Sequence, residues 1–167
     1  MGHEDLIETE ILCRVLTVSS SRAGDRDESG RRITDLLKAD GHLVREREVI
    51  PDSPERIEVE IESAVSSEIR VLLITGGTGL SALDQTVDVL ADLEDKELPG
   101  FGEFFRSLSF EEIGPRAMLS RARASLVEDT LVFSLPGSPD AVDLGMEELI
   151  LPALGHAVYE IDKEGHR

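Results

Sequence analysis

The sequence predicts an α/β fold in which helices cover both faces of a mostly parallel β-sheet. Short apolar runs alternate along most of the chain with segments whose apolar residues recur at helical spacing, and this alternation is typical of β-α-β units. The continuous apolar run at 71–75 is what a strand buried on both faces of a parallel sheet requires. In such sheets, ligands bind at the carboxyl ends of the strands, where serine, glycine and aspartate gather in this chain.

The first part of the chain is expected to form two strands and two helices. Residues 11–19 are an apolar run ending in serines, which indicates a buried strand, and the mostly polar residues 42–50 indicate a strand near a sheet edge. Helical spacing of apolar side chains predicts a helix over 30–39. A second helix is expected to start at Ser53-Pro54, because serine is a common N-cap and proline is favoured at the first helical position.

The rest of the chain continues the alternation of strands and helices. The further expected elements are helices at 86–93 and 101–113, a strand pair at 123–127 and 130–135, and a helical region at about 139–157 that Pro152 could break. Residues 1–9 are expected to be a flexible acidic tail and residues 10–160 a single domain.

Length and composition place the chain among ordinary globular proteins. A chain of 167 residues can bury a core without disulfides or a structural metal. The single cysteine, Cys13, lies in an apolar run and is expected to be a small buried hydrophobic side chain. No apolar run approaches the roughly 20 residues needed to span a bilayer. The N-terminus is acidic where a secretory signal would be basic, so we expect a cytoplasmic protein with no membrane partner.

The chain is strongly acidic. Asp and Glu total 35 against 17 Lys and Arg, which gives a formal net charge of -18. The lysines are Lys38, Lys96 and Lys163. An acidic, lysine-poor surface is expected of a halophilic protein working in concentrated salt, and a merely acidic mesophilic protein is the alternative. The same charge repels polyanions, so nucleic acid is not an expected partner.

A glycine-rich loop directly follows the expected strand at 71–75. Its sequence is Gly76-Gly77-Thr78-Gly79, and the glycines allow a tight turn and a close approach of backbone amides to an anion. The loop lacks the lysine of a P-loop and the spacing of a dinucleotide fingerprint. The pattern alone therefore leaves two interpretations open, phosphate binding and a plain strand-to-helix turn.

Asp52 and Asp84 are the candidate metal ligands. Asp52 ends the second expected strand, and Asp84 lies near the start of the helix after the glycine loop. Carboxylates from separate strand-end loops commonly hold a hard cation such as Mg²⁺ between the protein and substrate phosphates. The alternatives are that Asp84 complements a helix dipole and that Asp52 is a turn or capping residue.

Other residues at the expected strand ends are candidate contacts for an anion or a pterin. These residues are Ser20, Arg22, Ser120, Arg121, Gly137 and Ser138. The last two open a helix, whose free amides and positive dipole end suit an anion, although a well-capped helix without a ligand has the same sequence. The other four form two serine/arginine clusters, which are natural phosphate contacts or, alternatively, arginines paired with surface acids.

The order of these motifs resembles that of the MoaB and Mog family of molybdenum cofactor biosynthesis proteins, which is also seen as the gephyrin G domain. The resemblance covers about residues 10–155. It rests on the segments 27–30, 50–52, 74–79 with Asp84 and Thr86, 99–103, 119–122 and 135–138. The stretch 101–114 is similar to the MoaB branch in particular.

The resemblance implies a three-layer α/β/α molybdopterin-binding fold. It also implies binding of molybdopterin, a pterin whose terminal phosphate, in active members, receives AMP from MgATP. The products are adenylyl-molybdopterin and pyrophosphate, and the adenylylated pterin passes to the metal-insertion enzyme. By matching position, Asp52 and Asp84 would be the catalytic, metal-linked carboxylates, and Gly76, Gly77, Thr78 and Gly79 would hold phosphate.

One position departs from the pattern of the active members. They often carry arginine immediately before the aspartate that matches Asp84, whereas this chain has Leu83. A non-catalytic protein that binds molybdopterin or nucleotide is therefore the alternative function. The resemblance also implies a homo-oligomer, a trimer or hexamer, and Phe101, Phe104 and Phe105 offer apolar surface for its contacts.

We predict that stability depends on salt. The midpoint of thermal unfolding should rise from low to molar KCl, because self-repulsion within a chain of net charge -18 is screened as the salt concentration rises. The Debye length falls to about 3 Å at 1 M. Thermal melts across that range of KCl measure the effect, and a melting temperature that stays flat or falls with added salt would rule out the halophilic interpretation.

Overall fold

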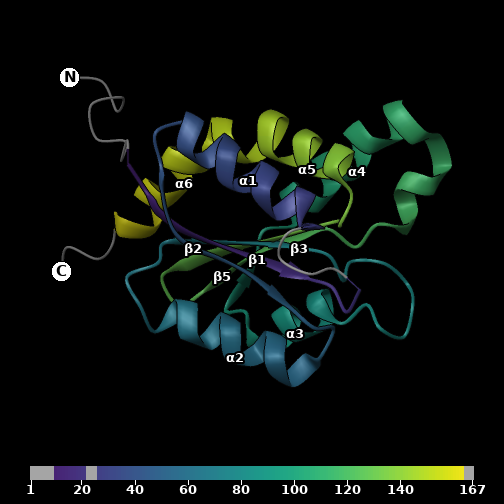
Figure 1. The fold of residues 1–167 in the computed structure, drawn as a ribbon. Helices are drawn as coiled ribbons and strands as arrows, with labels where there is room; N and C mark the ends of the chain where they lie inside the picture. Colours follow the sequence, from purple (N-terminus) through teal and green to yellow (C-terminus); the bar gives the residue numbers. More distant parts are fainter. Residues whose placement is uncertain (1–9, 22–25, 164–167) are drawn as a thin grey trace.

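A computed structural model describes residues 10–21 and 26–163 of the chain. In this part, six strands form one sheet in the order β2-β1-β3-β6-β5-β4 (Figure 1). The strands are β1 (Leu12–Val18), β2 (Leu43–Ile50), β3 (Val71–Thr75), β4 (Lys96–Glu97), β5 (Arg123–Val127) and β6 (Thr130–Leu135). Strands β2, β1, β3 and β6 are parallel, and β5 and β4 extend the sheet by antiparallel pairing. The predicted, mostly parallel sheet is confirmed.

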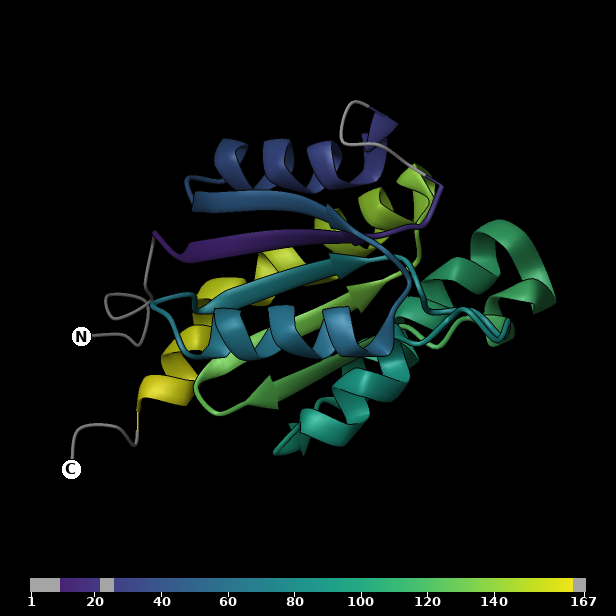
Figure 2. The same ribbon diagram turned by 60° about the horizontal axis from the view of Figure 1, so that its bottom comes forward.

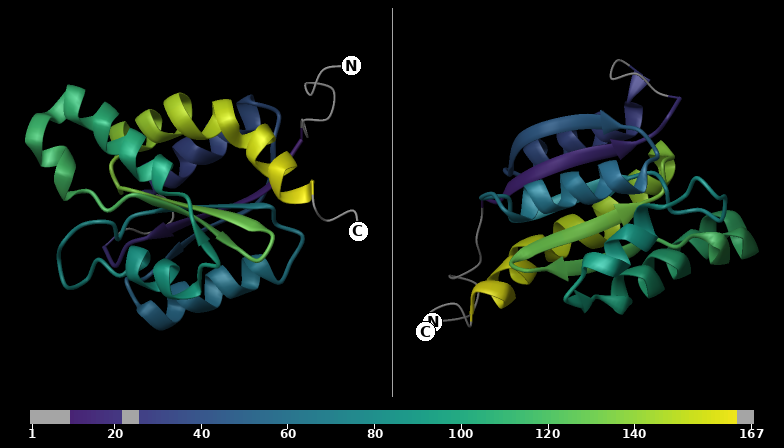
Figure 3. Two further views of the ribbon diagram at one scale, coloured as in Figure 1. Left: turned by 180° about the vertical axis from the view of Figure 1, so that it is seen from behind. Right: turned by 90° about the horizontal axis from the view of Figure 1, so that it is seen from below.

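Helices cover both faces of the sheet, which confirms the three-layer α/β/α fold (Figures 1 and 3). The helices are α1 (Glu28–Ala39), α2 (Pro54–Val65), α3 (Thr86–Leu93), α4 (Pro99–Ile113), α5 (Pro139–Gly145) and α6 (Leu151–Asp162). Helices α1, α4, α5 and α6 lie on one face, and α2 and α3 lie on the other. Leu37, Phe105 and Leu154 belong to the core under the first layer, and Ile61 and Leu90 to the core under the second.

The central strands supply both cores because successive side chains point to opposite faces of a sheet. In β3, which is buried throughout, Val71 and Leu73 join the core beneath α1, and Leu72 and Ile74 join the core beneath α2. Strand β2 lies at the edge, and only Ile50 among its residues is buried. The polar sequence of 42–50 correctly predicted that position.

Helix α1 begins at Glu28 rather than at Gly30 because Asp27 caps it. The Asp27 carboxylate accepts a hydrogen bond from the Gly30 backbone N–H at 2.9 Å. The same buried carboxylate accepts from the Thr17 hydroxyl at 2.8 Å and from the Arg47 guanidinium at 2.8 Å. Aspartate is a favoured N-cap, and the arginine compensates the buried charge.

Several short elements were not predicted. They are β4, the 3₁₀ helix Gly114–Leu119 and a π-helical turn, Met146–Ile150, which separates α5 from α6. Elements this short carry too little periodicity to be recognised from a pattern. The break expected at Pro152 therefore comes slightly earlier, and Pro152 itself lies in the first turn of α6, where proline is tolerated.

The phenylalanines expected to offer apolar surface divide between core and surface. Phe105 is 1% exposed. Phe101 stacks on Phe105 with 6.1 Å between ring centroids and meets Phe133 edge-on at 5.3 Å. The structure thus corrects the expectation for Phe101 and Phe105, which pack in or against the core. Phe104, at 64% exposed, does offer apolar surface.

Two expectations from composition can be compared with the structure. Cys13 is fully buried, as predicted, and burial raises the pKa of its thiol to about 12. The thiol therefore stays protonated near neutral pH and acts as a small hydrophobic side chain. Among the helices of residues 10–21 and 26–163, none combines the length and the apolar character needed to cross a membrane.

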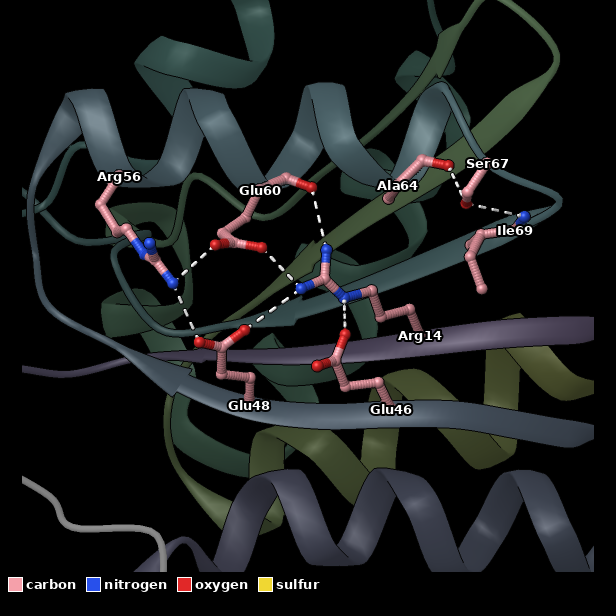
Figure 4. Close-up of polar contacts among 8 residues, drawn as sticks. All are labelled: Arg14, Glu46, Glu48, Arg56, Glu60, Ala64, Ser67 and Ile69. Atoms are coloured by element: carbon pink, nitrogen blue, oxygen red, sulfur yellow. Dashed lines mark hydrogen bonds and ion pairs between the residues drawn. The ribbon is translucent and has the colours of Figure 1, made fainter.

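A buried arginine joins the acidic sheet edge to α2 (Figure 4). Arg14 of β1 is 6% exposed, and its guanidinium forms ion pairs with Glu46 at 2.8 Å, Glu48 at 3.2 Å and Glu60 at 2.5 Å. Arg56 binds Glu48 and Glu60 from the other side, at 2.9 and 2.7 Å. Burying a charge is costly unless partners compensate it, so this network allows β2 to carry glutamates next to the core.

We predict that Arg14→Met lowers the free energy of unfolding by about 3–5 kcal/mol, because it removes one partner of a buried ion pair. Glu60, which is 6% exposed, would lose its buried cation. The double variant Arg14→Met/Glu60→Gln should recover part of the loss, since it also removes the stranded charge. Urea denaturation in molar KCl measures both values. A loss below about 1 kcal/mol for Arg14→Met would mean that the network behaves like an exposed ion pair.

Candidate functional site

An open pocket of about 580 Å³ lies at the carboxyl ends of β1, β2, β3 and β6, whose converging ends can be followed in Figure 2. The loops after these four strands supply most of its lining. From them come residues 19–21, Asp52, residues 76–79 with Leu83 and Asp84, and residues 136–138. The pocket thus lies at the carboxyl-terminal end of the sheet, where α/β folds of this kind bind their ligands.

Most of the predicted site residues meet in this pocket. Those that line it are Ser20, Asp52, Gly76, Gly77, Thr78, Gly79, Asp84, Gly137 and Ser138. Ser120 and Arg121 instead line a second groove, together with Asp88, Arg106 and Arg123. Arg22 lies outside the described residues. The roles of these residues toward a ligand remain predictions.

The geometry of the glycine loop requires glycine at two positions. Gly76 has φ +102°, and a Cβ there would lie 2.3 Å from the carbonyl oxygen of Val18. Gly77 has φ +73°, and a Cβ there would lie 2.1 Å from the hydroxyl oxygen of Thr86. Both the left-handed backbone and the close contacts exclude a side chain. Glycine is thus needed here for the turn itself, and the same bare backbone lines the pocket, so the geometry is compatible with both interpretations of the loop.

Both candidate metal ligands are held by the loops from which they project. One oxygen of Asp52 accepts from the Ser20 backbone N–H and from its hydroxyl, both at 2.8 Å. One oxygen of Asp84 accepts from the Ser81 backbone N–H at 2.9 Å. Among the described residues, the second oxygen of each carboxylate makes no hydrogen bond. Each aspartate thus has an oxygen left for a ligand of the pocket.

Neither aspartate is the N-cap of the helix that follows it, whereas a dipole role for Asp84 and a turn role for Asp52 stay open. Helix α2 is capped by Ser53, whose hydroxyl accepts from the Arg56 backbone N–H at 3.3 Å. Helix α3 has Gln85 at its N-cap and no side-chain cap bond. Ser138, by contrast, does cap α5, because its hydroxyl accepts from the Ala141 backbone N–H at 3.3 Å.

Hydroxyl groups that were not predicted as site residues hold the loops together. Thr75 donates its hydroxyl hydrogen to the Pro136 carbonyl at 2.8 Å, and Ser29 donates to the Gly137 carbonyl at 2.8 Å. The backbone N–H of Gly76 donates to the Leu135 carbonyl at 2.9 Å. Ser29 lies in the segment 27–30 that carries the family resemblance, which was a signal of its importance. Its partner is 108 positions away, so the contact itself leaves no trace in the sequence.

The charge of the pocket is negative. Its lining, among the described residues, contains the carboxylates of Asp52 and Asp84 and no lysine, arginine or histidine. No cluster of three or more histidine, cysteine, aspartate or glutamate side chains suited to a metal occurs in the described part of the chain. The donor chemistry of the two carboxylates suits Mg²⁺, which is commonly bound through one or two carboxylates and keeps several waters beside substrate phosphates.

Comparisons of the sequence with known proteins identify its family. The model of a family described as "Probable molybdopterin binding domain" matches residues 14–156. Molybdenum cofactor biosynthesis protein B of Halalkalibacterium halodurans is 44% identical over 156 residues, which are 92% of each chain. The protein of the same name from Bacillus cereus is 40% identical over 164 residues, which are 97% of each chain.

Solved structures show the same likeness in three dimensions. A crystal structure of molybdenum cofactor biosynthesis protein B superposes with a TM-score of 0.90 at 41% identity, covering 93% of this chain and 98% of the other. The tungsten cofactor synthesizing protein MoaB of Pyrococcus furiosus superposes with a TM-score of 0.84 at 33% identity, covering 92% and 98%. From its sequence and its fold, the chain therefore belongs to the molybdopterin-binding-domain family that contains the MoaB proteins of molybdenum cofactor biosynthesis.

Proposed function

We propose that this chain binds molybdopterin and transfers AMP to it from MgATP. A terminal phosphate oxygen of molybdopterin attacks the α-phosphorus of ATP. The bond between the α-phosphorus and the oxygen bridging to the β-phosphate breaks, and pyrophosphate leaves with that electron pair. The observation that carries the proposal is the pocket in which Asp52 and Asp84, from separate loops, meet the glycine loop. The adenylyl-molybdopterin would then pass to the metal-insertion enzyme.

The charge of the pocket explains why a cation has to accompany the substrates. ATP and molybdopterin bring several phosphate charges to a lining that contains two carboxylates, in a chain of net charge -18. Mg²⁺ supplies charge neutralisation and orients the phosphates when it is bound. Asp52 and Asp84 would hold it through the carboxylate oxygens that the loops leave unbonded.

The other role of the pocket residues would be to position the two substrates for the reaction. A phosphate nucleophile is already ionised, so the reaction needs alignment and charge stabilisation more than it needs a general base. The glycines at 76, 77 and 79 place backbone without side chains along the lining. Because the Gly76 N–H is bound to the Leu135 carbonyl, the backbone amides of residues 77–79 would be the donors to phosphate oxygens. Ser20, which binds Asp52, would keep that carboxylate in place as substrates enter.

A second candidate function, binding of molybdopterin or nucleotide without catalysis, is favoured by Leu83. This side chain lines the pocket next to Asp84 and is 64% exposed. Active relatives often carry arginine at the matching position, and an arginine there could stabilise charge on the transferred phosphoryl group. The loss of that cation favours slow or absent transfer, whereas it leaves the pocket open to a ligand.

We predict that Asp84→Asn lowers the rate of adenylyl-molybdopterin formation about 10²–10³-fold, because an amide is a poorer ligand for Mg²⁺ and one electrostatic group is lost. Leu83→Arg should raise the rate of the wild type. The assay combines protein, molybdopterin and MgATP in molar KCl, with thermal melts to verify folding. Asp92→Asn is the matched control, since it removes the same charge from an exposed position of α3 outside the pocket.

The outcomes of this assay test the metal-ligand role, the choice between the two candidate functions and the need for a cation. Equal rates for the wild type and Asp84→Asn would contradict the metal-ligand role. A wild type that forms no product but binds molybdopterin tightly would favour the binding protein. Product that forms equally well in EDTA would contradict the need for a divalent cation.

We also propose that the chain forms a homo-oligomer, a trimer or hexamer. Helix α4 and the 3₁₀ helix that follows it project from the body of the fold near the site (Figures 1 and 2). The exposed large apolar residues of this projection are Phe104, Phe110, Ile113, Met118 and Leu119. Grouped apolar side chains on an otherwise acidic surface favour a contact between subunits.

We predict that sedimentation equilibrium in molar KCl shows a trimer or hexamer at micromolar concentration. Phe104→Glu should shift the protein toward the monomer, because it buries an unpaired charge in the contact. Val59→Glu, at an apolar position of α2 that is 54% exposed against 64% for Phe104, is the control and should leave the assembly unchanged. A wild-type monomer under these conditions would refute the proposed oligomer.

A further inference from the structure

The guanidinium of Arg121 lies at the centre of a set of contacts beside the pocket. Its Nε donates to the Gly79 carbonyl at 2.9 Å, and its Nη2 donates to the Asp84 carbonyl at 2.9 Å. The same guanidinium binds the Asp88 carboxylate with distances of 2.9, 3.1 and 3.1 Å. The backbone N–H of Arg121 also donates to the Thr78 carbonyl at 3.0 Å.

These contacts hold both ends of the segment 79–84, which carries Asp84 into the pocket. The other hydrogen bonds of this segment, among the described residues, are local to 81–85. They join Ser81 to Asp84 and Leu83, and Ala82 to the Gln85 side chain. Arg121 is thus the residue that ties the segment to the rest of the fold, and Asp88 anchors Arg121 to the first turn of α3.

We infer that Arg121 is a positioning residue, which fixes the Asp84 carboxylate for the cation by clamping the backbone of 79–84 to α3. The inference rests on the proposed function, in which Asp84 holds Mg²⁺. Arg121 itself lines the second groove rather than the main pocket, so it acts through Asp84 and not by contact with the substrate phosphates.

The chemistry of arginine suits this role and that of lysine does not. A planar guanidinium has donors in several fixed directions and can serve two carbonyls and a carboxylate at once, whereas an ammonium is a compact point charge. The ion pair itself is accessible to solvent, with side chains 31% exposed in Arg121 and 52% in Asp88, so it adds little to overall stability. Hydrogen bonds from Arg121 lower the pKa of Asp88.

The chain offers a matched control two positions along. Arg123 pairs with Glu94 as Arg121 pairs with Asp88, and it lines the same groove. Its partners Glu94 and Glu97 lie beyond the C-terminal end of α3, away from the segment 79–84. Arg123→Lys therefore weakens a more buried arginine–carboxylate pair without touching the carbonyls of the glycine loop.

The test compares Arg121→Lys and Arg123→Lys with the wild type in two measurements. Binding of Mn²⁺ in the presence of ATP is titrated by electron paramagnetic resonance, with Mn²⁺ standing in for Mg²⁺. Amide hydrogen exchange reports opening of the segment 79–84. For Arg121→Lys we expect Mn²⁺ affinity to fall about 10–100-fold, as is typical when a supporting partner of a metal ligand is lost. Exchange in 79–84 should be faster, while Arg121→Lys should melt at a temperature no lower than Arg123→Lys, whose ion pair is more buried.

Asp88→Asn is a milder change. It leaves the hydrogen bonds from Arg121 to the Gly79 and Asp84 carbonyls in place and removes only the ion pair that holds Arg121 to α3. It should lie between the wild type and Arg121→Lys in both measurements. The inference is overturned if Arg121→Lys keeps wild-type Mn²⁺ affinity and wild-type exchange in 79–84, or if Arg123→Lys changes both as much. A wild type that binds no Mn²⁺ with ATP contradicts the proposed function instead, while the exchange data still test the clamp.

Discussion

The parallel pairing of β1 and β3 leaves no space for a side chain where the two strands end. Thr17 pairs with Thr75, so Val18 and Gly76 follow side by side, and a Cβ on Gly76 would lie 2.3 Å from the Val18 carbonyl. The chain must turn there with φ +102°, which glycine tolerates and other residues rarely adopt. This sharp turn leads residues 76–79 past the carboxyl ends of the strands, where they line the pocket together with the other strand-end loops.

The second constraint is electrostatic. An acidic chain is an unusual host for phosphate-rich substrates, and the described pocket lining adds carboxylates rather than cations. Two arginines near the site, within the part of the chain that the structure describes, are engaged by carboxylates: Arg47 compensates the buried Asp27, and Arg121 is bound to Asp88. These two cations thus stabilise the framework, and in the proposed function a divalent metal would provide positive charge for the substrates.

The order of the elements and the residues at the strand ends could be predicted because they depend on local patterns. Apolar runs and helical spacing identified the main strands and helices, and the polar composition of β2 identified it as a strand near an edge. The family resemblance identified Asp52 and Asp84, which the structure then brought into one pocket. Short elements such as β4 and the turn Met146–Ile150 escaped prediction because a few residues show no period.

The sequence by itself determined the fold class, the ligand-binding edge of the sheet and the family, because hydrophobic period and motif order are properties of neighbours along the chain. Only the tertiary structure decided which residues from distant segments of the chain contact one another. The sequence left Arg121 open as a phosphate contact or as a partner of surface acids, and the structure shows its guanidinium on the Asp88 carboxylate and on the carbonyls of Gly79 and Asp84. Phe101 and Phe105 looked available for a subunit contact, yet they pack with the core. Such contacts depend on distances between segments remote in sequence, and no local pattern encodes those distances.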